Sequence, residues 1–457
     1  MKKIIALLLA LTMVFALVAC ASTEKPAETP ADNQETEKPA EQPEETPAEQ
    51  PEETPAAAGS VYYLNFKPEA DEAWQKIAAT YTEQTGVPVK VVTAASGTYD
   101  TTLAAELDKS SAPTLFQCGN QGAINSYGDY CYPLDGTAIM DQMTTDAFNL
   151  KGEDGQTLSI GYCYEAFGII VNKALLEKAG HSIDEITNFD SLKAVADDIH
   201  ARADELGFDA FSSAGLDGSS SWRFSGHLAN MPLYYEFRDD GVTAQPATIT
   251  GAYLENFKNI WDLYITDSAT TGAALATATG DESEAEFGEG KAAFYQNGTW
   301  EYSNLTGTFG MDPADLAMIP IYCGVDGEEK AGLCAGTENC WAINNESSEE
   351  DIQATIDFLV WVVTSDEGTT MLAEEFGPCP FKDAKDPENV FFQDANKYTA
   401  EGNYVVTWAF NWTPAVDDWR AAVVDALTQY TAGTGDWSAV ETAFVQGWAT
   451  QYAKENA

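Results

Sequence analysis

Histidine and basic side chains are scarce in this sequence. Its 457 residues include 3 histidines, and 23 lysines and arginines stand against 73 aspartates and glutamates. Recognition of nucleic acid or of anionic lipid needs clustered lysine and arginine, so the composition disfavours both partners. Residues 21–58 contribute −9 and two N-terminal lysines +2 to the formal net charge of −50, which leaves −43 for the chain from Gly59. This field suits a neutral or cationic small ligand, unless the charge serves only solubility.

The sequence also lacks the common signatures of hydrolases and zinc sites. It contains no GxSxG, HExxH or CxxC pattern, and its histidines, His181, His200 and His227, are isolated. We therefore expect no catalytic residue, no metal and no cofactor. A glycosidase needs only two opposed carboxylates, so the many acids leave that class open, but no local pattern supports it.

Cysteine pairing is not determined by the sequence. Apart from Cys20, seven cysteines occur, an odd number that cannot pair completely within one chain. Cys118 with Cys131 and Cys334 with Cys340 are near enough in sequence to form disulfides, and we expect most of the seven to remain thiols.

The N-terminus has the layout of a secretory signal. Lys2 and Lys3 precede an apolar run that ends at Cys20, and "LVAC" at 17–20 resembles a bacterial lipobox. We interpret 1–20 as a lipoprotein signal peptide and Cys20 as the lipidation site, the alternative being an ordinary signal peptide that ends in cysteine. The protein is then anchored outside the cell, on the outer face of the bacterial cytoplasmic membrane.

A low-complexity segment and a globular body follow. Residues 21–58 consist largely of Pro, Glu, Thr and Ala, with "EQPEETPA" twice in tandem, and they lack the apolar periodicity of a folded element. We predict a disordered tether. No later stretch is apolar for the eighteen or so residues that a membrane span requires, which indicates a soluble body.

The body alternates helical and strand patterns. "DEAWQKIAATYTEQTG" places four apolar residues on one helical face and ends at Gly86, and "VPVKVVTA" after it reads as a strand. Further strands are expected in "SVYYLNF", "APTLFQC", "FGIIVN", "KAAFYQ" and "LAMIPI". Helices are expected at 172–180, 190–207, 253–264, 349–363 and 415–430. This order predicts an α/β fold with mixed sheets flanked by helices.

Several stretches, taken in order, resemble the extracellular solute-binding proteins of ABC importers, specifically the carbohydrate-binding group that includes maltose-binding protein. They are "YLNFKPEADEAWQKIAATYTEQTGVPVKV", "APTLFQCGNQGAINSYGDYCYPLD", "EAFGIIVNKALLEKAGH", "FGEGKAAFYQNGTWEYSNL" and "TIDFLVWVVTSDEG". The resemblance implies a type II periplasmic-binding-protein-like fold with two lobes, a ligand cleft between them and hinge closure. It places the N-terminal lobe at 59–164 plus 320–372 and the C-terminal lobe at 167–318 plus 376–457.

The stretch "FGEGKAAFYQNGTWE" has two possible interpretations, a phosphate-binding loop or a segment that places an aromatic side chain in a ligand site. A Walker loop requires GxxxxGK followed by Ser or Thr, whereas Ala292 follows Lys291. We instead expect a helix end, a turn and a buried strand that delivers Trp300. By resemblance, Trp300 and Tyr302 match a sugar-stacking position and Trp419 a C-terminal one, although Trp300 and Trp419 also fit a core. Trp222, Trp408 and Trp412 are further candidate platforms.

Polar ligand contacts are expected from loops at strand ends. The resemblance matches Glu165 to a carboxylate that accepts sugar hydroxyls, and it matches the loop after the first strand to a ligand loop. The alternative for each is a solvated loop residue. The candidates are Asn65, Lys67, Glu69, Gln117, Asn120, Gln121 and Glu165.

The function predicted from these features is capture of a sugar or oligosaccharide and its delivery to an ABC permease, which a cytoplasmic ATPase drives. We expect a monomer that is not an enzyme. The alternatives are a binding protein for a peptide or polyamine, a surface-anchored glycosidase and an adhesion or peptide receptor.

Overall fold

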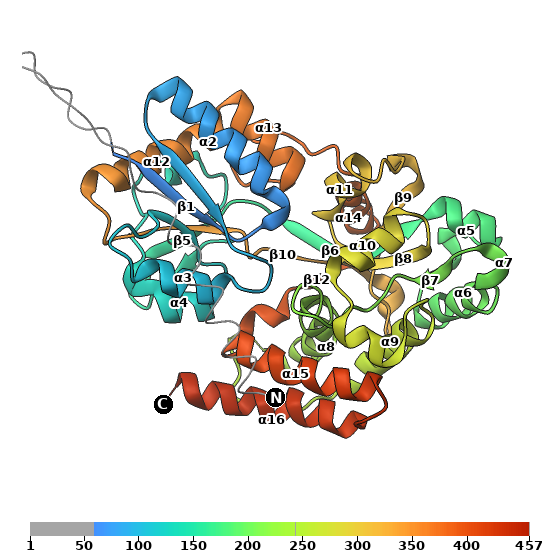
Figure 1. The fold of residues 1–457 in the computed structure, drawn as a ribbon. Coiled ribbons are helices and arrows are strands. Elements are labelled where there is room, and N and C mark those ends of the chain that lie inside the picture. Colours follow the sequence, from blue (N-terminus) through green and yellow to red (C-terminus); the bar gives the residue numbers. More distant parts are fainter. Residues whose placement is uncertain (1–58, 243, 457) are drawn as a thin grey trace, which may run out of the picture. The chain divides into compact units, whose positions relative to one another are not determined.

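The computed structural model describes residues 59–242 and 244–456 (Figure 1). The predicted signal peptide at 1–20, the lipidation site Cys20 and the predicted tether at 21–58 lie outside the described residues. Within the described part, none of the helices has the combined length and apolar character of a membrane span.

The first of two sheets has the strand order β2-β1-β3-β11-β5-β4. Strands β1, β2 and β3 are parallel, and β11 runs antiparallel between β3 and β5. The strands are β1 (Val61–Asn65), β2 (Val89–Thr93), β3 (Leu115–Gln117), β4 (Leu150–Lys151), β5 (Thr157–Gly161) and β11 (Cys340–Ile343). Its helices include α2 (Asp71–Thr85), α3 (Tyr99–Leu107), α4 (Gln121–Tyr127), α12 (Glu349–Thr364) and α13 (Asp366–Glu375).

The second sheet has the order β12-β10-β6-β8-β7, and β9 also pairs with β6. Its strands are β6 (Glu165–Asn172), β7 (Asp209–Phe211), β8 (Ala292–Gly298), β9 (Leu316–Ile319), β10 (Ala331–Gly336) and β12 (Tyr404–Thr407). Around it lie α5 (Lys173–Ala179), α6 (Phe189–Ala201), α7 (Ala203–Leu206), α8 (Ala229–Asp240), α9 (Leu254–Thr266), α10 (Gly280–Gly288), α11 (Glu301–Gly307), α14 (Val390–Ala400), α15 (Val416–Thr431) and α16 (Trp437–Glu455). Both sheets are mixed and flanked by helices, which confirms the predicted two-lobe α/β class.

Local patterns account for most helix boundaries. In α2, Trp74, Ile77, Ala78 and Tyr81 are buried as the periodicity predicts, and Gly86 ends the helix with a left-handed φ of 77°. Helix α5 begins where the Asn172 side chain accepts a hydrogen bond from the Leu175 amide. The helix predicted at 190–207 is instead two helices. They meet at Arg202, whose backbone leaves the helical region and whose guanidinium donates to the Ala179 carbonyl.

The lobes are connected by short crossing segments. Residues 162–164 lead from β5 to β6, and residues 337–339 lead from β10 to β11. The predicted boundary at 320 needs correction, because β10 pairs with β6 and β12 of the second sheet. Phe376 and Phe381, in turn, pack in the core of the first lobe. The remaining boundaries stay a prediction.

Large aromatic residues fill both cores. In the first lobe, the Tyr162 and Trp341 rings stack with centroids 4.0 Å apart, and Trp74 packs against the edge of Trp341. In the second lobe, Phe224 packs at 5.0 Å against the fully buried Trp261. All seven cysteines after Cys20 are free thiols, so neither candidate disulfide is formed.

A histidine on α6 connects this helix to β7. His200 Nδ1 lies 2.8 Å from an Asp209 carboxylate oxygen, and this hydrogen bond raises the pKa of His200. The stabilisation is therefore complete below the unfolded-state pKa of about 6.5, and it is lost as pH rises through the higher folded-state value.

We expect His200→Gln to lower the free energy of unfolding at pH 5.5, by less than about 1 kcal/mol because the imidazole is 42% exposed. At pH 8.5 the variant and the parent protein should be equally stable. Chemical denaturation at the two pH values measures this, and a difference that is the same at both would contradict it.

Candidate functional site

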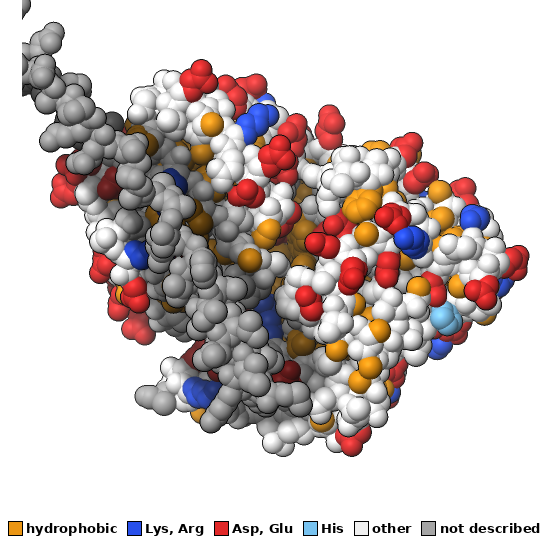
Figure 2. Space-filling model, viewed as in Figure 1, with side chains coloured by type: hydrophobic (Ala, Val, Ile, Leu, Met, Phe, Trp, Pro, Cys, Tyr) orange, Lys and Arg blue, Asp and Glu red, His pale blue; other side chains and the backbone are white. Residues whose placement is uncertain are grey.

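A cavity of about 500 Å³ lies between the two lobes. The first lobe contributes the loop after β1, and the second contributes the segments that precede α8 and follow β8. Acidic side chains are spread over the face shown in Figure 2, whereas lysine and arginine are isolated on it. The cavity walls combine aromatic rings with carboxylates.

Three tryptophans and two phenylalanines form the apolar part of the wall. The Trp222 and Trp300 ring centroids are 6.1 Å apart, and the Trp408 and Phe410 rings stack at 5.4 Å. Gly298 allows the position of Trp300, because a Cβ there would lie 2.2 Å from the indole ring. Aromatic faces of this kind bind the apolar C–H face of a sugar ring or another flat apolar group.

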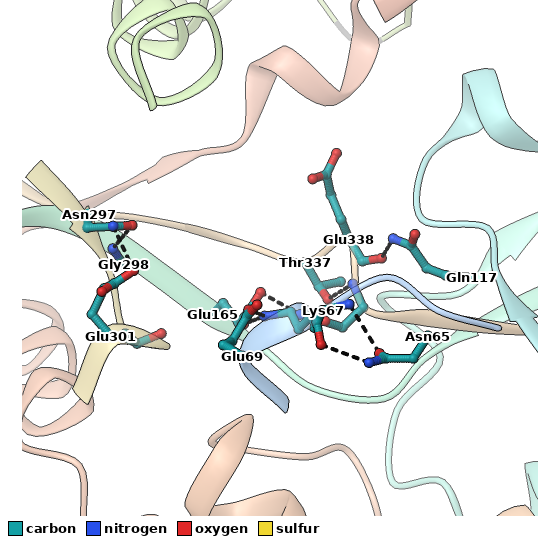
Figure 3. A network of polar contacts seen from close by, with 12 residues as sticks. Asn65, Lys67, Glu69, Gln117, Glu165, Asn297, Gly298, Glu301, Thr337 and Glu338 are labelled. Carbon is teal, nitrogen blue, oxygen red and sulfur yellow. Dashed lines mark hydrogen bonds and ion pairs between the residues drawn. The ribbon is translucent and has the colours of Figure 1, made fainter. Parts of the chain in front are cut away.

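A buried ion pair crosses from the first lobe to the second (Figure 3). Lys67 Nζ contacts the Glu165 carboxylate, whose other oxygen accepts from the Asn339 amide. Burial alone lowers the pKa of Lys67, but the carboxylates of Glu165 and Glu69 outweigh it and raise that pKa. Lys67 Nζ also lies 5.2 Å from the Trp300 ring centroid, which is a cation–π distance.

Arg223 and His227 support the aromatic wall from one short helix, η5 (Arg223–Leu228). Arg223 is 1% exposed and donates to the Ser213 and Gln296 carbonyls at 3.2 and 3.1 Å. His227 stacks on Phe167 at 3.9 Å, and its pKa lies well below the usual range because the ring is buried. The ring is therefore neutral at physiological pH.

Two carboxyl groups lie together on the wall formed by α10 and α11. Burial and the neighbouring carboxylates of Glu284 and Glu69 hold the pKa of Glu301 well above its usual range. Burial also raises the pKa of Glu284. Asn297 Nδ2 donates to Glu301 at 2.7 Å, and the Asn304 amide donates to Glu284. A protonated carboxyl group donates a hydrogen bond and an ionised one accepts, so the raised pKa values favour a pair that does both.

Six of the thirteen predicted ligand contacts line this cavity, and two line a neighbouring one. Lys67, Glu69, Glu165, Trp222, Trp300 and Trp408 line the cavity, so the structure brings residues from five separate sequence segments together. Gln117 and Asn120 line the second cavity.

The other five predicted contacts line neither cavity. Trp419 is fully buried and donates its indole N–H to the Phe444 carbonyl at 2.9 Å, which supports its core alternative. Trp412 packs on Phe237, and Tyr302 packs on Phe391. The buried Asn65 side chain donates a hydrogen bond to the Lys67 carbonyl and accepts one from the Lys67 amide. Gln121 is exposed on α4.

Several lining residues were not predicted from the sequence. Phe66, Arg223 and Glu301 are chain neighbours of predicted contacts, so those motifs pointed to them. Arg420 likewise follows the predicted contact Trp419, whereas Glu338 had no such signal. Among the described residues, no group of three or more His, Cys, Asp or Glu side chains is arranged to hold a metal ion.

Comparisons with known proteins agree with this architecture. Residues 76–400 match the model of a family described as bacterial extracellular solute-binding protein. No curated protein matches the chain.

Solved structures with similar folds include RafE, a protein of Streptococcus pneumoniae, in complex with raffinose. Its TM-score is 0.67 at 15% identity, over 87% of this chain and 100% of that one. The GacH receptor of Streptomyces glaucescens has a TM-score of 0.64 at 18% identity, over 88% and 99%. A sugar transporter from Bacillus licheniformis in complex with stachyose has a TM-score of 0.63 at 16% identity, over 86% and 100%. At such identities the likeness concerns the fold.

Proposed function

This chain belongs to the bacterial extracellular solute-binding proteins, and on that premise we propose that it captures a sugar or oligosaccharide between its lobes by hinge closure. We further propose that it delivers the ligand to an ABC transporter permease. A lipid at Cys20 and a tether at 21–58 would hold it at the outer face of the membrane.

One observation carries the saccharide proposal: the interlobe cavity alternates aromatic faces with carboxylates and donors. Saccharides need both, because their ring faces are apolar and their rims are hydroxyl. A platform that removes about 100 Å² from water contributes about 2.5 kcal/mol. Micromolar affinity needs about 8 kcal/mol, so the three tryptophans and the hydrogen bonds together reach this range. The similar structures in complex with raffinose and with stachyose support the same ligand class.

A screen of ligands tests this proposal. The purified full-length chain would be heated with mono- and oligosaccharides, amino acids, peptides and polyamines, with product analysis after overnight incubation. A ligand at a hundred times its dissociation constant stabilises the fold by about 2.7 kcal/mol. Stabilisation by a saccharide that stays intact supports the proposal. Stabilisation by peptides or polyamines alone contradicts the ligand class, and cleavage contradicts the binding-only role.

Trp300→Ala should lower the affinity for the saccharide identified in this screen by about 70-fold, because the variant loses about 2.5 kcal/mol of contact with the indole ring. Calorimetric titration measures the change. Trp361→Ala is the matched control, because that indole lies on α12, donates to Gln84 and lines neither cavity. Equal affinities of the two variants would contradict the platform role.

A polyamine is the second candidate ligand, and the carboxyl groups of Glu69, Glu284 and Glu301 favour it. All three line the same cavity, and the neighbouring Glu284 and Glu69 carboxylates help to raise the pKa of Glu301. A protonated amine placed among them would relieve that repulsion. The polyamines in the screen test this candidate directly.

A further inference from the structure

A second cavity of about 340 Å³ adjoins the first. Phe66, Glu338 and Arg420 line both, so the two cavities meet at these residues. The second cavity lies between the first-lobe segment around α4 and the second-lobe segment that begins α15. Each cavity alone is within the range of about 300–1,000 Å³ that small-ligand pockets occupy.

Arg420 stands at this junction with its hydrogen-bonding capacity unused. Among the described residues it makes no hydrogen bond and no ion pair, and its Nε is buried without a partner. The guanidinium lies 5.3 Å from the Phe410 ring centroid. At Gly226, a Cβ would lie only 3.3 Å from an Arg420 nitrogen, so glycine leaves space for this side chain. Buried donors are normally satisfied, so these N–H groups are free for a ligand.

The second cavity contains another unsatisfied polar group. Thr413 is 4% exposed and lines this cavity, and its Oγ1 has no hydrogen-bond partner among the described residues. Two residues later, Ala415 has a φ of 37°, the single positive value of a non-glycine residue in the described part of the chain. Strained backbone of this kind is concentrated at binding sites. The free Thr413 hydroxyl and the strained Ala415 therefore lie on the wall of the second cavity, just before α15 begins.

We propose that the second cavity is a continuation of the ligand site and that the ligand is an oligosaccharide whose chain passes Arg420 and ends beside Thr413. The inference rests on the proposed saccharide function and deepens it. Arg420 and Thr413 donate to ring or hydroxyl oxygens, and the carboxylates of Glu338 and Asp417 accept from hydroxyls. A monosaccharide in the first cavity leaves Thr413 and Asp417 unused, because these two residues line the second cavity alone.

Affinity as a function of chain length tests the inference. The full-length protein would be titrated with galactose, melibiose, raffinose and stachyose, and with the maltose, xylose and N-acetylglucosamine series from one to five rings. In the series that binds, affinity should rise at least about tenfold when the chain becomes long enough to pass Arg420 into the second cavity, as expected for a further hydrogen bond to a charged group. Arg420→Gln and Thr413→Val should each reduce this increment.

Thr413→Val separates ligand binding from a structural role, because its hydroxyl has no protein partner to lose. The variant should unfold at the parent temperature or above and still bind the longer saccharide more weakly. Thr364→Val and Arg238→Gln are matched controls, since both residues lie outside the cavities. The inference is overturned, and the proposed function is not, if a monosaccharide binds as tightly as any longer saccharide. The same holds if the increment in affinity is unchanged in both variants. Absence of binding in every series overturns the proposed function, and the inference with it.

Discussion

Lys67→Met is expected to lower the free energy of unfolding by about 3–5 kcal/mol, the range observed when one partner of a buried ion pair is removed. The side chains of Lys67 and Glu165 are only 7% and 4% exposed. Without the lysine, Glu165 keeps the Asn339 amide as a partner but has no neutralising charge. Its burial cost is then uncompensated.

Urea denaturation near pH 8 measures this loss, and its pH dependence identifies the cause. An unpaired buried carboxyl has a raised folded-state pKa, so the penalty is present at high pH and decreases as pH falls and the group takes up a proton. Lys67→Met combined with Glu165→Leu should recover much of the stability. Lys193→Met, from an exposed pair with Asp197, is the control and should cost less than about 1 kcal/mol. A loss independent of pH, or no recovery in the double variant, would argue against an unpaired charge.

Trp419→Ala should cost about 3–5 kcal/mol of folding stability and leave ligand affinity within about twofold of the parent value. The ring is fully buried between α15 and α16, with its centroid 4.7 Å from that of Phe444 and 6.1 Å from that of Trp448. Truncation leaves a cavity there and breaks the indole hydrogen bond to the Phe444 carbonyl.

The contrast with Trp300→Ala makes this prediction specific. Denaturation and calorimetric titration on both variants, at a temperature where each is folded, separate stability from affinity. Trp300→Ala should mainly lose affinity, and Trp419→Ala should mainly lose stability. If Trp419→Ala loses ligand binding without a large loss of stability, the placement of Trp419 in the core is wrong.

Features determined by neighbouring residues were predictable from the sequence. Helix α2 has its apolar stripe and its terminal Gly86 within one window, and the helical period of 3.6 suffices to define it. Strand β8 and the position of Trp300 after it are likewise visible within one short stretch, "KAAFYQNGTW". The motif therefore predicted one wall of the cavity.

Features determined by distant pairing were not predictable in this way. The pattern of β10 does not show that its partners are β6 and β12, so its lobe was misassigned. Trp419 fits both an apolar helix face and a ligand platform, and only the packing of α16 against it decides between them. Arg420 directly follows Trp419 in the chain, but its place in the site depends on the meeting of two cavities, which the sequence does not show.

The crossing segments at 162–164 and 337–339 have a consequence for how this receptor could be tuned. Glu165 follows the first directly, while Glu338 and Asn339 are part of the second. Under the proposed hinge closure, Glu165 and Glu338 would contact the ligand and also lie at two of the connections that act as pivots. We expect changes at these positions to alter affinity and the balance of open and closed forms together, whereas changes at Trp222 or Thr413 would adjust selectivity without touching the pivots.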